Sequence, residues 1–129
     1  MRCLAVDDEF VALTKMSTLL SDYGTCDTAN SGEQALIMFH KAFLEGSPYH
    51  LITIDIEMPG MNGIQLLKRI TIDENLLFIP RSYKLIITAE GSPGNVIQAI
   101  ENKCDSFLVK PVKKDTLHMR LKELNILRS

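Results

Sequence analysis

Four short apolar runs, separated by longer segments with a helical period, constrain the fold of this 129-residue chain more than any other feature. The runs are 3–6 (CLAV), 51–54 (LITI), 85–87 (LII) and 107–109 (FLV). Because they are continuous rather than alternating, they are typical of parallel strands covered on both faces. A fifth segment, 25–29 (TCDTA), is more polar and suits an edge strand.

The segments between the runs carry apolar residues at the spacing of amphipathic helices. In chain order these residues are Leu13, Met16 and Leu20; Leu36, Phe39 and Phe43; Ile64, Leu67 and Ile70; Val96, Ile97 and Ile100; and Leu117, Leu121 and Leu124. We expect the second helix to begin with a capping box at 31–34 (SGEQ) and to bury its three apolar residues. The third is expected to start near Asn62 and the fourth near Pro93, and Gly24 is placed to end the first as a left-handed cap.

Strands alternating with helices along the whole chain indicate a βα-repeat architecture. At 129 residues this predicts a doubly wound α/β sheet rather than a closed barrel of eight strands. Right-handed crossovers place helices on both faces of such a sheet. With the polar strand at an edge, the pattern matches the flavodoxin-like order 2-1-3-4-5 with five helices. We expect one domain over residues 1–129, since no linker or internal repeat divides the chain.

Composition and charge exclude several classes of partner. The formal net charge is −2, and Lys113 and Lys114 are too few for a nucleic-acid-binding patch. The apolar runs are too short to span a bilayer, and the first residues turn acidic too early for a signal peptide. The three cysteines are widely spaced and form no CxxC pair, which favours reduced thiols in a cytoplasmic protein.

Polar residues follow the four apolar runs at the points where the strands end. Asp7 and Asp8 follow the first, Asp55 the second, Thr88 the third and Lys110 the fourth. The carboxyl ends of parallel strands form one edge of an open sheet, where binding sites lie. We therefore expect these side chains to gather in one site.

The residue types in this set favour phosphoryl chemistry. Three crowded carboxylates, from Asp7, Asp8 and Asp55, repel one another, and a divalent cation with oxygen ligands, such as Mg²⁺, relieves that repulsion. A metal, an ammonium group and a hydroxyl around one carboxylate make a cradle for a phosphoryl group. Asp55 is the best candidate for the acceptor, because it is alone on its strand and carboxylates are known phosphoryl acceptors.

The same residues carry a resemblance to a known family. The motifs are VDDE at 6–9, IDIEMPGMNG at 54–63, ITAE at 87–90 and FLVKP at 107–111. In this order, the chain closely resembles the receiver domain of bacterial two-component response regulators, especially stand-alone regulators of the chemotaxis type. The resemblance covers essentially the whole chain and implies a phosphorylation-dependent signalling switch that catalyses only its own phosphorylation and dephosphorylation.

The resemblance implies a role for each matching position. Asp55 would take a phosphoryl group from the phosphohistidine of a sensor histidine kinase or phosphotransfer protein. Asp8, Asp55 and the backbone carbonyl of Glu57 would hold Mg²⁺, with Asp7 helping directly or through water. Thr88 and Lys110 would bind phosphoryl oxygens.

The family also implies how the signal would leave the domain. Phe107 matches the switch aromatic that turns inward when Thr88 moves toward the phosphate, although it also fits a plain core residue. The Lys110–Pro111 bond is cis in the family. Output would pass through the face of the fourth helix, fifth strand and fifth helix to a protein target, not to nucleic acid or a membrane, from a monomer or weak dimer.

Two acids and two long connections are specific to this chain. We hypothesise that Glu57 and Glu90, each two residues past a site residue, modulate the phosphate lifetime, the alternative being ordinary solvated acids. The connections at 44–50 and 72–83 are long. For the second, we favour an extension of the third helix that folds back on the core over a partner-docking loop.

Three other functions compete with the signalling switch. A phosphorelay intermediate is a variant of it. A phosphohydrolase of the haloacid-dehalogenase type also uses a strand-end Asp with Mg²⁺, but here the acidic pair precedes the acceptor and no cap domain is present. A flavin or dinucleotide binder is disfavoured because no glycine-rich loop follows the first strand.

Overall fold

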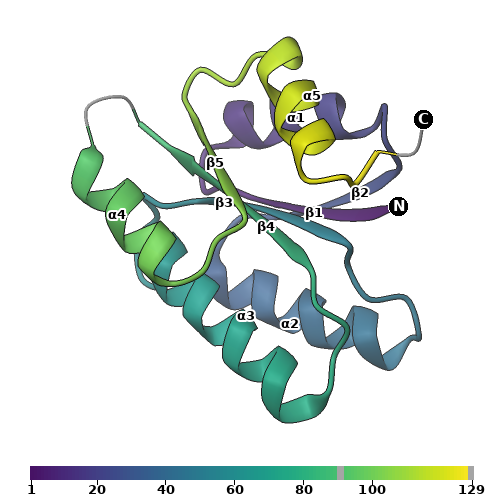
Figure 1. Ribbon diagram of the computed structural model, residues 1–129. Helices are drawn as coiled ribbons and strands as arrows, with labels where there is room; N and C mark the ends of the chain where they lie inside the picture. The colour runs from purple at the N-terminus through teal and green to yellow at the C-terminus, as the bar shows by residue number, and fades with distance from the viewer. Residues whose placement is uncertain (90–91, 128–129) are drawn as a thin grey trace.

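Five parallel strands form one sheet in the computed structural model, which describes residues 1–89 and 92–127 (Figure 1). The strand order is β2-β1-β3-β4-β5. The strands are β1 (Arg2–Val6), β2 (Thr25–Ala29), β3 (Leu51–Asp55), β4 (Tyr83–Thr88) and β5 (Ser106–Val109). All four pairings are parallel, so the predicted flavodoxin-like topology, with the polar strand at an edge, is confirmed.

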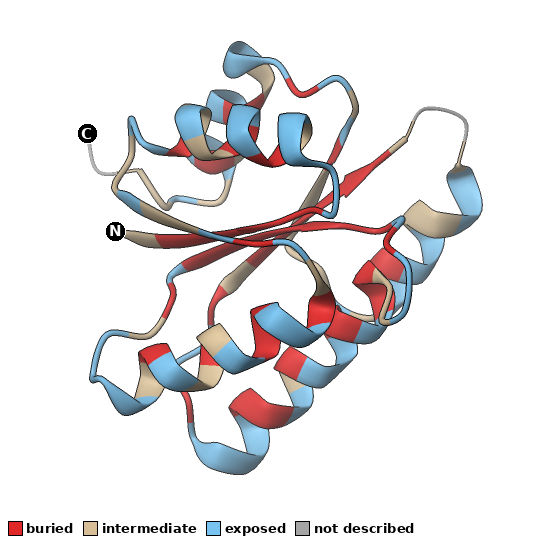
Figure 2. Cartoon of the chain, turned by 180° about the vertical axis from the view of Figure 1, so that it is seen from behind, coloured by how far each residue is buried: buried red, intermediate tan, exposed pale blue. Residues whose placement is uncertain are grey.

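Helices cover both faces of the sheet, as Figure 1 shows. On one face lie α1 (Phe10–Leu20) and α5 (Lys114–Glu123), and on the other α2 (Gly32–Leu44), α3 (Gly63–Leu77) and α4 (Pro93–Glu101). Each face has its own apolar core, with Leu51 in one and its neighbour Ile52 in the other. Strand β3 is therefore buried along its whole length, which explains its continuous apolar sequence (Figure 2).

Helix α3 starts directly after Asn62, as predicted, and the capping box predicted at α2 is only half formed. At α3, Asn62 Oδ1 accepts from Gln65 N, and Gln65 Oε1 accepts from Asn62 N, both at 2.9 Å. At α2, Ser31 Oγ accepts from Gln34 N at 3.1 Å, but Gln34 Oε1 accepts from Asn30 N instead of Ser31 N. At α2, the Gln34 side chain therefore bonds the amide of the residue before the N-cap instead of the amide of the N-cap itself.

The prediction that Gly24 ends α1 as a left-handed cap is wrong. The helix ends at Leu20, and its capping residue Ser21 is right-handed. A Cβ on Gly24 would lie 2.0 Å from the carbonyl oxygen of Met1. The glycine is needed because the chain passes close to the backbone of Met1, whose carbonyl accepts a hydrogen bond from Thr25 N at 3.0 Å.

Two expectations about apolar residues also need correction. Phe43 is half-buried and packs against the core from its border. In α4, Ile97 and Ile100 are 56% and 59% exposed, and Ala99 is the buried residue. Helix α4 therefore contacts the core through a small side chain and leaves its larger ones in solvent.

The extension of the third helix is confirmed, and a buried ion pair ties it to the sheet. Helix α3 continues to Leu77, and Phe78 ends it in the left-handed conformation with φ 55°. Lys84 Nζ on β4 lies 2.7 Å from Glu74 Oε1 and 2.8 Å from the carbonyl oxygen of Ser82. Only Ile79 of the apolar residues beyond Asn75 folds back on the core, because Leu76, Leu77 and Phe78 are exposed.

Both ends of the described chain lie at the amino edge of the sheet. A cavity there is lined by residues from both ends, including Met1, Tyr23, Ile126 and Leu127. The strand ends that carry the predicted site form the opposite edge. Within residues 1–89 and 92–127, no helix is both long and apolar enough to cross a membrane.

Candidate functional site

The polar strand ends meet at the carboxyl edge of the sheet. Asp7 and Asp8 follow β1, and Asp55 is the last residue of β3. One carboxylate oxygen from each of these three residues lies within 4.8 Å of the other two. Asp7 and Asp55 are buried, whereas Asp8 is exposed. The strand order alone brings them together, because β1 and β3 are neighbours.

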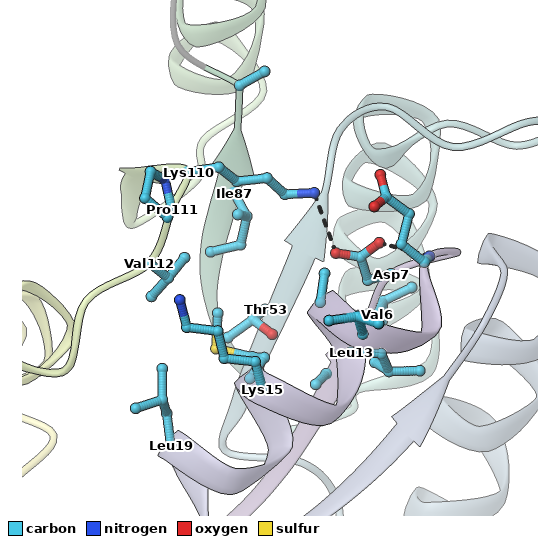
Figure 3. Close-up of a pocket in the computed structure, with 16 residues that line it drawn as sticks. Val6, Asp7, Leu13, Lys15, Leu19, Thr53, Ile87, Lys110, Pro111 and Val112 are labelled. Carbon is cyan, nitrogen blue, oxygen red and sulfur yellow. Dashed lines mark hydrogen bonds and ion pairs between the residues drawn. The ribbon is translucent and has the colours of Figure 1, made fainter.

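Lys110 reaches this acidic cluster from β5, across the sheet. Its Nζ donates to Asp7 Oδ2 at 3.3 Å, as Figure 3 shows. The same Nζ lies 3.5 Å from Asp55 Oδ1. The Lys110–Pro111 peptide bond is cis, as the resemblance implied. The Lys110 amide also donates to the carbonyl of Thr88 at 2.8 Å, which fixes the start of this loop against the end of β4.

Backbone groups hold two of the carboxylates in place. Asp7 Oδ1 accepts from Glu9 N at 2.9 Å, and Asp55 Oδ1 accepts from Glu57 N at 3.4 Å. A Cβ on Gly63 would lie 2.4 Å from the Asp55 carbonyl oxygen. The glycine thus lets the first turn of α3 pack directly on the backbone of Asp55.

The cluster carries more negative than positive charge. Burial, together with the charge of Asp7, raises the pKa of Asp55 to about 7, although Lys110 opposes the shift. Burial would lower the pKa of Lys110, but Asp55 and Asp7 outweigh it and raise that pKa. Three carboxylates against one ammonium leave an excess of two negative charges when all are ionised. Oxygen donors in this arrangement fit a divalent cation such as Mg²⁺.

Thr88 and Phe107 lie on the next two strands after β3, with Thr88 at the end of β4 and Phe107 on the edge strand β5. Thr88 ends β4, is 1% exposed, and donates from its hydroxyl to the Ala89 carbonyl at 3.4 Å. Phe107 is half-buried on β5, level with Ile86 of β4. The Arg120 guanidinium of α5 lies 5.8 Å from the centre of the Phe107 ring. Glu90 lies outside the described residues.

A comparison with known protein families identifies the family of this chain. The family model described as "Response regulator receiver domain" matches residues 3–122. The chain belongs to this family. It is 35% identical over 126 residues to the chemotaxis protein CheY-3 of Vibrio cholerae, covering 96% of this chain and 91% of that protein. It is 31% identical over 126 residues to the chemotaxis protein CheY of Pseudomonas aeruginosa, covering 96% and 95%.

A solved structure confirms the receiver fold. The crystal structure of a response regulator receiver domain protein from Clostridium thermocellum matches with a TM-score of 0.80 and 26% identity, over 95% of this chain and 91% of that one. Receiver domains are signalling switches rather than classical enzymes. The readings as a dehalogenase-type hydrolase or a dinucleotide binder are therefore set aside in favour of the receiver family.

Sequence reasoning missed residues that shape the site without bearing its charge. The Glu9 amide and Gly63 position Asp7 and Asp55 through the backbone. The sequence did contain a signal for Gly63. Glycine is a poor helix former, so its presence directly after the Asn62 helix cap indicates a close approach of another part of the backbone. No comparable signal marks Glu9, since its amide rather than its side chain makes the contact.

Proposed function

We propose that Asp55 accepts a phosphoryl group from the phosphohistidine of a sensor histidine kinase or phosphotransfer protein. The observation that carries the proposal is the buried Asp55 carboxylate, grouped within 4.8 Å of Asp7 and Asp8 and 3.5 Å from Lys110. The burial of Asp55 beside other charged groups supports a reactive role, because ionisable groups in such surroundings are concentrated at functional sites.

Mg²⁺ is the cofactor that this site would hold. Asp8, Asp55 and the backbone carbonyl of Glu57 would be the protein ligands, with Asp7 acting directly or through water. When bound, the ion supplies positive charge that offsets both the carboxylates and the incoming phosphoryl oxygens. The excess negative charge of the cluster supports this assignment.

In the transfer step, an Asp55 carboxylate oxygen forms a bond to phosphorus while the P–N bond of the donor breaks. The electron pair of that bond returns to the imidazole nitrogen, and because the other ring nitrogen of the donor carries a proton, a neutral histidine leaves. Lys110, already close to Asp55 and Asp7, would pair with one phosphoryl oxygen. The Thr88 hydroxyl, which has only a long bond to Ala89, would donate to another.

The signal would follow from the movement of Thr88. Phe107, half-buried beside Arg120, would turn inward as the switch residue and change the face formed by α4, β5 and α5. This face presents exposed Ile97, Ile100 and Met119, which suits a protein target rather than nucleic acid or a membrane. We further propose that the domain works in the cytoplasm as a monomer or weak dimer and catalyses only its own phosphorylation and dephosphorylation.

Intact mass spectrometry after incubation with Mg²⁺ and acetyl phosphate tests the proposal. The wild-type protein is expected to gain one phosphoryl group, and an Asp55→Asn variant none. An unmodified wild-type protein, or an equally modified variant, would contradict the assignment. Timing the loss of the added mass in Glu57→Ala, Glu90→Ala and wild-type proteins tests whether these acids modulate the phosphate lifetime, since unchanged lifetimes would make them ordinary solvated acids.

A further inference from the structure

A cavity of about 430 Å³ lies between α1 and the segment 110–112 that follows β5 (Figure 3). Its walls are mostly apolar. The apolar side chains that a ligand would contact include Leu13, Met16, Leu19, Ile87 and Val112. The volume is within the range of small-molecule sites, roughly 300–1,000 Å³. The cavity opens beside the phosphorylation site but extends away from Asp55, along the inner face of α1.

A single buried hydroxyl interrupts the apolar lining. Thr53 of β3 is 1% exposed and lines the cavity (Figure 3). Its hydroxyl has no hydrogen-bond partner among the described residues 1–89 and 92–127, while the backbone of Thr53 is paired in the sheet. The hydroxyl forms part of the cavity wall, so it is available to a molecule in the cavity.

The charged groups at the mouth of the cavity nearly cancel. Asp7 and Glu9 face Lys15 and Lys110 around the opening. Lys110 is already bonded to Asp7, so it offers little net charge to a ligand. A charged ligand would therefore gain little electrostatic attraction at the mouth, and it would lose hydration on entering the apolar part of the cavity. Both effects favour a neutral ligand.

We propose that this cavity is a binding site for a small neutral molecule with an aromatic or compact apolar body and one hydrogen-bonding group. The apolar body would pack between Leu13, Met16 and Val112, and the polar group would bond the Thr53 hydroxyl. The site is separate from phosphoryl transfer, although Asp7 and Lys110 form a common wall between the two.

Chemical-shift titration of the ¹⁵N-labelled protein with indole, phenol, toluene and benzoate tests this inference. Saturable shifts by indole and phenol, centred on the amides of α1 and of Val112, are the expected result. Thr53→Val keeps the side-chain shape and removes the hydroxyl. It is therefore expected to weaken the binding of phenol about fivefold and to leave the binding of toluene unchanged. Benzoate should bind at least tenfold more weakly than phenol.

Filling the cavity gives the second arm of the test. Ala12→Phe places a ring in the space and is expected to abolish binding of both aromatic probes, with Leu19→Trp as the alternative if Ala12→Phe fails to fold. Thr14→Phe, on the exposed side of α1, is the matched control and should bind as wild type. Shifts that never saturate, or binding that survives the filled cavity, would overturn the inference. None of these measurements depends on phosphorylation of Asp55.

Discussion

The two ends of the central sheet each bury charged residues, but they balance them differently. At the amino end, Lys84 is paired with Glu74, and both oxygens of that carboxylate are used, because Ser82 N and Ser82 Oγ donate to Oε2 at 2.7 Å. At the carboxyl end, Asp7, Asp8 and Asp55 share the single ammonium of Lys110. One cluster is neutral and closed, and the other has unused oxygens and excess negative charge.

This difference separates a structural role from a chemical one. A buried pair whose two charged groups bond each other and Ser82 fixes how α3 meets β4. A buried group of like charges lowers the stability of the metal-free protein and gains it back when a cation binds. One end of the sheet thus holds the fold, and the other carries the cluster for which phosphoryl transfer is proposed.

The largest effect is expected from opening the closed cluster. Lys84→Met leaves the Glu74 carboxylate buried without its counter-charge, and should lower the free energy of unfolding by about 3–5 kcal/mol. Urea denaturation measures this. The double variant Glu74→Gln/Lys84→Met keeps an acceptor for Ser82 and is expected to recover most of the loss. If the free energy of unfolding of Lys84→Met lies within about 1 kcal/mol of the wild-type value, the Glu74–Lys84 pair contributes little to stability.

Relieving the open cluster should stabilise the metal-free protein. Asp55→Asn removes one of three repelling charges and is expected to raise the free energy of unfolding in EDTA at pH 8 by on the order of 2 kcal/mol. The folded pKa, about 7, lies above the unfolded value of 3.8, so the protonated form is favoured on folding. The stability contributed by Asp55 is complete below pH 3.8 and is lost as the pH rises through 7.

The pH dependence provides the control for that variant. The gain from Asp55→Asn should shrink as the pH falls from 8 toward 4, because the wild-type carboxyl becomes protonated in the fold. Urea midpoints at several pH values, measured without metal, follow this directly. A gain that is constant with pH would mean that packing, rather than charge, accounts for the stabilisation.

A smaller effect is expected from the cation itself. Mg²⁺ at ten times its dissociation constant should stabilise the folded protein by about 1.4 kcal/mol, seen as a higher melting temperature. Asp8→Ala should lose this response. Asp22→Ala, which removes an exposed acid outside the cluster, should keep it. If both variants respond as wild type does, the ion binds elsewhere on the protein.

The smallest effect is expected at the border of the closed cluster. Arg81 pairs with Asp105 near the Lys84 site, but its side chain is 58% exposed. Arg81→Gln should therefore cost less than about 1 kcal/mol in the same urea assay, since exposed ion pairs contribute little. A cost as large as that of Lys84→Met would mean that the closed cluster extends to the surface.

The sequence predicted the open cluster and missed the closed one for the same physical reason. Asp7, Asp55 and Lys110 follow apolar strands, and the topology of a parallel sheet brings strand ends together. Lys84 lies within a strand, and its partner Glu74 is in the last turn of α3, ten residues earlier in the chain. Local patterns also could not show that Met1 passes close to Gly24, nor that α4 contacts the core through Ala99. Such features depend on contacts between distant segments.

The position of the chain ends has a practical consequence. Met1, Ile126 and Leu127 line one cavity at the edge of the sheet opposite Asp55. A dye, a surface linker or a fused reporter attached at Met1 would therefore start at the edge of the sheet opposite the acidic cluster. The acidic cluster can then be observed on an immobilised or labelled protein.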